Sequence, residues 1–192
     1  MSRVAVLVAV AAVLAAGCSA SIGDPVRILP CTPSSHQLDE RMVLMAQSVP
    51  TASAVPCMRT KLDDWFLDDL DSWDGRTRIE FSRLIDEFAL TIELTRTCDR
   101  GGASETATDQ PGTRRFDQRI RTGSSYRDRR FYLLPGACVT YEFRLTGTGA
   151  EKAADEISRA LGFVGRDELA DQVRGYSDGR LQLDPEQLEH NA

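Results

Sequence analysis

The first clear periodicity in this chain of 192 residues is helical. Leu38, Met42 and Met45 follow one another at spacings of three and four, which places them near one face of a helix. Pro50 comes soon afterwards, and proline ends a helix because its ring fixes φ and removes the amide donor. We therefore expect a helix over residues 37–48.

A second helical spacing follows a short extended segment. Residues 51–57 are small or β-branched and are expected to be extended. The next apolar residues lie at helical spacing with aspartates between them: Leu62, Trp65, Phe66 and Leu70. This spacing predicts an amphipathic helix that ends before a turn at Asp74-Gly75.

Between residues 76 and 145 the period changes to two. Val139, Tyr141 and Phe143 alternate with Thr140 and Glu142, which is typical of a strand with one buried and one wet face. Five strands are expected, over residues 78–81, 90–98, 115–121, 129–134 and 138–145. A polar loop is expected over residues 100–112, and a tight hairpin turn at Pro135-Gly136.

The pattern becomes helical again near the C-terminus. Ala150, Ala153, Ala154, Ile157 and Leu161 share one face of a predicted helix. Gly162 is expected to cap that helix, residues 166–174 to form another, and residues 181–183 to add an edge strand. The order predicts an α+β domain over residues 37–185, with a mostly antiparallel sheet of about five strands and flanking N- and C-terminal helices. Residues 186–192 are expected to be a disordered tail.

The first residues have the organisation of a secretory signal. Arg3 precedes a thirteen-residue apolar run, which is too short for a membrane span of about 20 residues. The run leads into Leu14-Ala15-Ala16-Gly17-Cys18, which resembles the lipobox of bacterial lipoproteins, although Ala15 stands where that family usually has leucine. The resemblance implies removal of residues 1–17 and lipidation of Cys18. An ordinary signal peptide with an incidental cysteine is the alternative.

A lipidated Cys18 would place the protein on the extracytoplasmic face of the cell membrane without a spanning helix. Two or more acyl chains hold a protein stably at a bilayer. Residues 18–36 are rich in proline, glycine and serine, and we expect them to be an extended tether.

Four cysteines remain: Cys31, Cys57, Cys98 and Cys138. An even number in an exported chain predicts two disulfides, for which three connectivities exist. The pairing of Cys31 with Cys57 and of Cys98 with Cys138 closes the most local loops and is the one we prefer. A zinc site is the competing interpretation, but the chain has no C-x-x-C pair.

Three further strings carry a faint resemblance to exported envelope proteins of high-GC Gram-positive bacteria. They are Ala46-Gln47-Ser48-Val49-Pro50, Thr97-Cys98-Asp99 and Pro135-Gly136-Ala137-Cys138-Val139-Thr140-Tyr141. The resemblance implies a similar compartment and no particular activity.

Charge and composition exclude several functions. The net charge of −6 becomes −7 when Arg3 is removed with the signal, and an acidic chain does not suit nucleic-acid binding. The two histidines, His36 and His190, lie in the expected tether and tail, so a catalytic triad is not expected. No sequence motif implies a cofactor.

Two functions of carboxylates are compatible with the sequence. A hydrolase with a carboxylate pair has Glu80, Glu87, Glu93 and Glu142 as candidates, although solvent-facing charges are the simpler interpretation. A calcium loop would begin at Asp69 and Asp71 and end at Glu80. However, Trp73 and Asp74 occupy the positions that need a ligand and a glycine.

The basic residues gather in one segment. Arg119, Arg121, Arg127, Arg129 and Arg130 are the expected anion-binding residues, and strand alternation places the first two on one face. Guanidinium groups pair with phosphates, so anionic lipid or an anionic cell-wall polymer is the expected ligand, and an envelope protein is another possible partner. The alternative is a solvated face neutralised by Asp117 and Asp128.

The leading interpretation is a noncatalytic binding or interaction module, lipid-anchored in the envelope. A small-ligand-binding lipoprotein and a carboxylate-based extracytoplasmic hydrolase are the alternatives.

Overall fold

A computed structural model describes residues 29–32 and 38–184. Residues 1–17, Cys18, the two histidines and the tail at 186–192 therefore lie outside the described residues. Within the part of the chain that is described, none of the helices has the length and hydrophobicity of a membrane-spanning helix.

The centre of the fold is an antiparallel sheet of seven strands in the order β2-β3-β4-β8-β7-β6-β5. The strands are β2 (Trp65–Trp73), β3 (Arg76–Arg83), β4 (Asp86–Thr95), β5 (Ser104–Thr106), β6 (Arg114–Arg121), β7 (Ser125–Leu134) and β8 (Ala137–Thr146). Neighbours along the chain pair as hairpins, and β4 pairs with β8 in the middle of the sheet.

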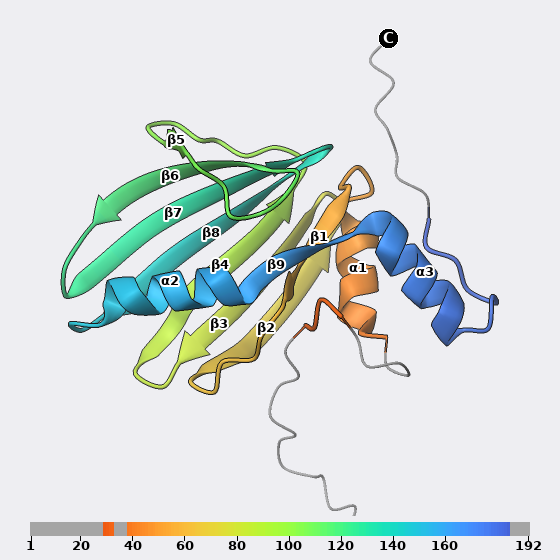
Figure 1. Ribbon diagram of the computed structural model, residues 1–192, viewed down its shortest axis with the longest axis horizontal. Helices are drawn as coiled ribbons and strands as arrows, with labels where there is room; N and C mark the ends of the chain where they lie inside the picture. The colour runs from red at the N-terminus through yellow and green to blue at the C-terminus, as the bar shows by residue number, and fades with distance from the viewer. Residues whose placement is uncertain (1–28, 33–37, 185–192) are drawn as a thin grey trace, which may run out of the picture.

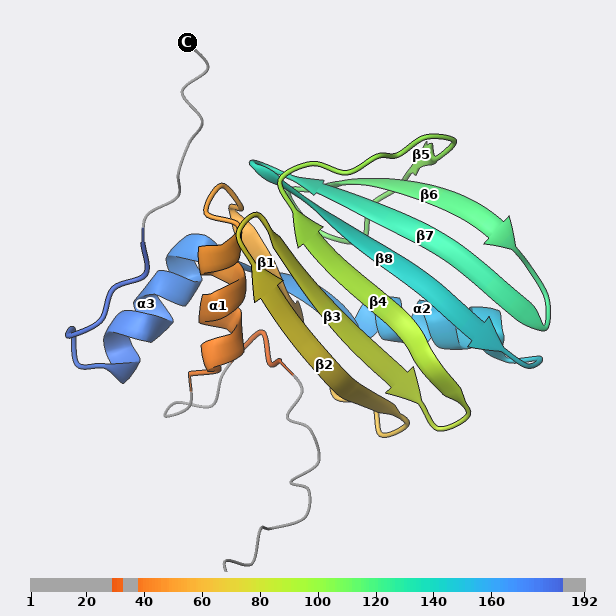
Figure 2. The same ribbon diagram turned by 180° about the vertical axis from the view of Figure 1, so that it is seen from behind.

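The remaining elements form a second layer on one face of the sheet (Figure 1). They are α1 (Glu40–Ser48), β1 (Ala54–Met58), α2 (Ala150–Ala160), β9 (Leu161–Gly165) and α3 (Arg166–Tyr176). Strands β1 and β9 pair with each other as a separate antiparallel ribbon. We call the covered side of the large sheet the inner face and the other side the outer face. Seen from behind, no helix lies over the outer face (Figure 2).

The core lies between these two layers. Alternate residues of β8, among them Tyr141, Phe143 and Leu145, point to the inner face and are at most 1% exposed. They pack in one cluster with residues of the covering layer such as Met45 and Ile157. The period-two pattern therefore correctly predicted which face of this strand is buried.

Residues 62–70 do not form the predicted helix. From Trp65 onward this segment is strand β2, which pairs with β3. Trp65 and Leu67 are buried whereas Phe66 and Asp68 are exposed, so burial follows a period of two. The helical spacing of the apolar residues was accidental, and pairing with a neighbouring strand decided the conformation.

The sheet is larger than the expected five strands. All five expected strands are present, most of them longer than predicted, and β2 and the short β5 raise the number to seven. Strand β5 lies inside the expected polar loop at 100–112. Residues 181–183 form no strand among the described residues.

Two glycines lie where another part of the chain approaches closely, a backbone at Gly136 and the Arg59 side chain at Gly162. Gly136 has a φ of 68° in the β7–β8 turn, and a Cβ there would lie 1.8 Å from the Thr51 carbonyl oxygen. Gly162 lies inside β9 instead of capping α2, and a Cβ there would lie 2.5 Å from Arg59 Nε. The predicted hairpin turn is thus confirmed, and the predicted cap is wrong.

The two disulfides have the preferred predicted connectivity. Cys31 bonds to Cys57 and Cys98 bonds to Cys138, with Cα separations of 4.9 and 5.8 Å. The first bond fastens residues 29–32 to β1, where Pro30 also forms a bridge to Met58. These four residues, placed in the expected tether, are joined to the fold, and Leu29 is 1% exposed.

Candidate functional site

Three arginines lie side by side on the outer face, one on each of three adjacent strands. Arg121 of β6 is opposite Arg127 of β7, and Arg127 is opposite Arg144 of β8. We call these three residues the arginine ladder. All three are exposed.

Two local features of the backbone produce this alignment. The tight turn at Pro135-Gly136 pairs Leu134 with Ala137, and that register brings Arg127 opposite Arg144. A bulge between Arg119 and Arg121 then shifts β6 by one residue, so that Arg121 joins the same face.

One carboxylate, that of Glu142, lies beside the arginine ladder. Glu142 accepts hydrogen bonds from Arg144, at 3.0 and 2.7 Å, and from Arg129 at 3.4 Å. Burial tends to raise the pKa of Glu142, but the hydrogen bond from Arg144 and the charge of Arg129 outweigh it, so the pKa lies below its usual value. Among the described residues, Arg121 and Arg127 form no ion pair. The outer face therefore carries an excess of positive charge here.

The structure does not bring all five predicted arginines together. Arg121, Arg127 and Arg129 are on the outer face, but Arg119, which precedes the bulge, is on the inner face, where it pairs with Glu151 of α2 at 3.3 Å. Arg130 also points inward and is 3% exposed. The expectation that the first two shared a face was wrong because a bulge interrupts the alternation.

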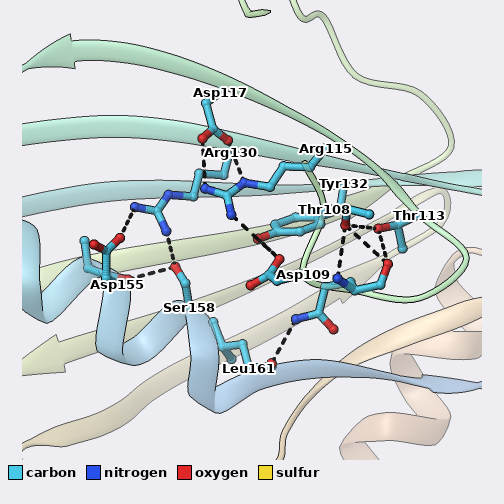
Figure 3. A network of polar contacts seen from close by, with 12 residues as sticks. Thr108, Asp109, Thr113, Arg115, Asp117, Arg130, Tyr132, Asp155, Ser158 and Leu161 are labelled. Carbon is cyan, nitrogen blue, oxygen red and sulfur yellow. Dashed lines mark hydrogen bonds and ion pairs between the residues drawn. The ribbon is translucent and has the colours of Figure 1, made fainter. Parts of the chain in front are cut away.

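The inner face has its own polar network, shown in Figure 3. The Arg130 guanidinium donates to Asp128 at 3.0 Å, Ser158 at 2.7 Å and Asp155 at 2.9 Å. It also lies 4.8 Å from the centre of the Phe143 ring. Burial lowers the pKa of Arg130, but its hydrogen bonds with Tyr126, Asp128 and Asp155 raise the pKa more, so the guanidinium stays charged. Since Asp155 and Ser158 belong to α2, this network joins α2 to the sheet.

A second part of the network joins the loop before β6 to the core. Arg115 donates two hydrogen bonds of 2.8 Å to Asp117 and lies 3.7 Å from Asp109. Tyr132 donates to the same Asp109 at 3.2 Å, and Gln110 donates to the carbonyl of Leu161 at 3.2 Å. These groups satisfy one another beneath the covering layer, so we assign them to stability and not to ligand binding.

The acidic residues of β2 and β3 lie on the other half of the outer face. Asp69 is opposite Glu80, and Asp71 is opposite Arg78, which donates to Glu80 at 2.7 Å. Desolvation and the nearby Asp69 raise the pKa of Asp71. Among the described residues no cluster of three or more His, Cys, Asp or Glu side chains is arranged to hold a metal ion. The calcium interpretation therefore has no support from the geometry.

The other chemical candidates are also accounted for. Glu80, Glu93 and Glu142 each pair with an arginine on the outer face, which is not the buried carboxylate pair that a hydrolase needs. The aromatic candidates for a pocket are core residues, with Trp65, Tyr132 and Tyr141 at most 3% exposed. Trp73 is exposed and stacks near Arg76.

Sequence reasoning missed Arg144. The signal was present, because a two-residue turn at Pro135-Gly136 fixes the register of the hairpin and so the partner of Arg127.

In comparisons with known proteins, the chain matches no family model, no curated protein and no solved structure. Function is therefore inferred from the chain's own geometry.

Proposed function

We propose that this chain is a lipid-anchored module on the extracytoplasmic face of the cell membrane, which binds a phosphate-bearing polyanion of the envelope through the arginine ladder. The observation that carries the proposal is the row of three arginines across adjacent strands, of which, among the described residues, Arg144 alone forms an ion pair, with Glu142.

Electrostatics supports an external anion at this place. Like charges directly opposite each other on neighbouring strands destabilise a sheet. Adjacent strands are about 4.8 Å apart, so the three side chains start within about 10 Å of one another. An anion bound across them relieves the repulsion, and guanidinium groups bind phosphate through paired hydrogen bonds.

The ligand class follows from the same chemistry. Anionic lipid headgroups and phosphate-rich cell-wall polymers both present phosphate groups to the outer side of the membrane, where the proposed anchor at Cys18 holds the protein. The shared chemistry is a phosphate diester, and the experiment separates its two sources.

The test removes the charge of the ladder. The triple variant Arg121→Gln, Arg127→Gln, Arg144→Gln is compared with a control triple variant, Arg159→Gln, Arg174→Gln, Arg180→Gln, which changes net charge equally on and after the helices. Each exposed arginine near an anionic surface contributes about 1 kcal/mol, so the ladder variant is expected to bind at least about tenfold more weakly. The probes are poly(glycerol phosphate) and vesicles of phosphatidylglycerol and phosphatidylcholine in equal parts.

Binding is measured for the chain from residue 19, which contains every helix and strand that the structure describes. Affinity should fall with salt, because the Debye length shrinks from about 10 Å at 0.1 M to about 3 Å at 1 M. Equal losses of affinity in both triple variants would show that binding depends on net charge and not on the ladder, which would contradict the proposal.

A further inference from the structure

Exposed apolar side chains gather at one end of the large sheet. They are Phe66, Leu84, Ile85, Phe88 and Ile120, with exposed fractions from 39% to 76%. We call this group the apolar end. Apart from these five, the exposed large hydrophobic residues of the described chain are Leu44, Trp73, Tyr176 and Leu181.

The strand register places these residues at the same end. The pairing of Arg83 with Asp86 makes Leu84 and Ile85 the tip of the β3–β4 hairpin. The amide of Thr146, the last residue of β8, donates to Asp86 at 3.0 Å, and Thr146 is opposite Ser125, the first residue of β7. The β3–β4 and β6–β7 turns therefore lie at one end of the sheet, as Figure 2 shows.

The hairpin tip holds its apolar groups outward. Leu84 and Ile85 are 76% and 71% exposed, which is unusual for a two-residue turn, where polar residues and glycine are preferred. Phe88 has a φ of 52°, a strained value for a bulky residue, and its amide donates to Ser82 Oγ at 3.2 Å. Since Ser82 is opposite Phe66, the two phenylalanines lie on either side of Ser82, on β2 and β4.

The arginine ladder lies directly behind this end. Arg127 is two residues from the start of β7 and Arg144 two residues from the end of β8. Two of the nearby acids form ion pairs: Asp64 with Arg83 at 2.9 Å, and Asp63 with Lys61 at 3.9 Å. Glu87 is the exposed acid of the hairpin that has no ion pair among the described residues. Asp68 and Asp86, which accept from Ser82 and Thr146, also form no ion pair among the described residues, so the positive charge beside the apolar end is supplied by the arginine ladder and not by the hairpin.

We propose that the apolar end inserts into the outer leaflet of an anionic bilayer, with Leu84 and Ile85 reaching the acyl chains and the arginine ladder at the level of the phosphates. This inference deepens the proposed function by naming the lipid bilayer as the phosphate source. Apolar side chains at a tip with basic side chains one step behind them match the layers of a bilayer surface.

The covalent reach of the chain agrees with this orientation. Ten residues, 19–28, separate Cys18 from Leu29, and a segment of that length spans about 35 Å when extended. Pro30 bridges to Met58, seven residues before Trp65, where β2 starts at the apolar end. An anchor at Cys18 therefore permits the apolar end to face the bilayer.

The experiment compares two pairs of substitutions in the chain from residue 19. Leu84→Ser with Ile85→Ser removes the tip, and Leu44→Ser with Leu181→Ser removes equally apolar, exposed side chains elsewhere. On vesicles of phosphatidylglycerol and phosphatidylcholine in equal parts, the tip variant is expected to partition at least about tenfold more weakly, and the control pair as the parent does. On soluble poly(glycerol phosphate), both should bind as the parent does.

A second readout reports insertion directly. The emission of Ile85→Trp, after subtraction of the parent signal, is expected to shift to the blue on these vesicles and to be quenched by lipids brominated in the acyl chains. Unchanged partition of the tip variant, together with no quenching of the introduced tryptophan, would overturn the insertion and leave the proposed function standing. Loss of vesicle binding in the tip variant, with no loss in the ladder variant on either probe, would contradict the proposed function instead.

Discussion

At the scale of single residues, Glu142 sets how much positive charge the outer face presents. Its carboxylate accepts from Arg144 and Arg129, and the net effect of its surroundings lowers its pKa. The carboxylate thus has two opposed effects. It stabilises the sheet by separating like charges, and it competes with any external anion for the same guanidinium groups.

We expect Glu142→Gln to bind anionic vesicles more tightly than the parent and to be slightly less stable. Lowering the pH should likewise tighten vesicle binding and reduce stability, because it neutralises the Glu142 carboxylate. A carboxyl whose pKa is lowered by folding adds stability above its unfolded value of 4.5, and this contribution is lost as the pH falls through the folded pKa. Vesicle sedimentation and urea unfolding at neutral and acid pH measure the two effects, with Glu93→Gln on the same face as the control. Weaker binding by Glu142→Gln would contradict the competition.

At the scale of elements, what the sequence predicted depended on whether local contacts decided the outcome. The strand over residues 138–145 and the turn at Pro135-Gly136 were predicted because alternation and turn chemistry are local signals. Strand β2 was missed because its conformation depends on pairing with β3, while its own spacing looked helical. Of the ladder, Arg121 and Arg127 were predicted and Arg144 was missed, while the bulge that separates Arg119 from Arg121 cannot be read from alternation.

The attachment of α2 to the sheet depends on Arg130. Its charge is buried and is compensated by Asp128 on its own strand and by Asp155 and Ser158 on the helix. Removal of one partner from a buried pair leaves an uncompensated charge, which costs about 3 to 5 kcal/mol. The network therefore fixes where α2 lies, and with it the covering layer.

Arg130→Met is expected to lower the free energy of unfolding by about 3 kcal/mol or more, because Asp128 is then buried without its partner. The double variant Arg130→Met, Asp128→Asn also removes the uncompensated charge of Asp128 and should recover part of the lost stability. Urea unfolding of the two variants and the parent tests this. If the double variant is less stable than the single variant, buried charge is not the cause, and the contact of the guanidinium with the Phe143 ring is the better explanation.

At the scale of the whole molecule, the two faces of the sheet have separate roles. The inner face is filled by one core that extends from Leu29 to Leu183. No described helix covers the outer face, and part of this face is buried in a small apolar cluster of Phe116, Phe131 and the disulfide between Cys98 and Cys138. Since the core does not depend on the outer face, substitutions on the ladder or at the apolar end are expected to change binding while the fold is retained.

The two proposed membrane contacts are expected to act in order, the lipid anchor first. A lipidated Cys18 confines the protein near the bilayer, and the ladder and the apolar end then bind at a raised effective concentration. In cells, Cys18→Ser should release most of the protein from the membrane fraction, and metabolic labelling with a fatty-acid analogue should label the parent and not the variant. Adding the Leu84→Ser and Ile85→Ser pair should release the remainder. Equal labelling of the parent and Cys18→Ser would contradict lipidation at this residue, and the weaker contact would then have to hold the protein alone.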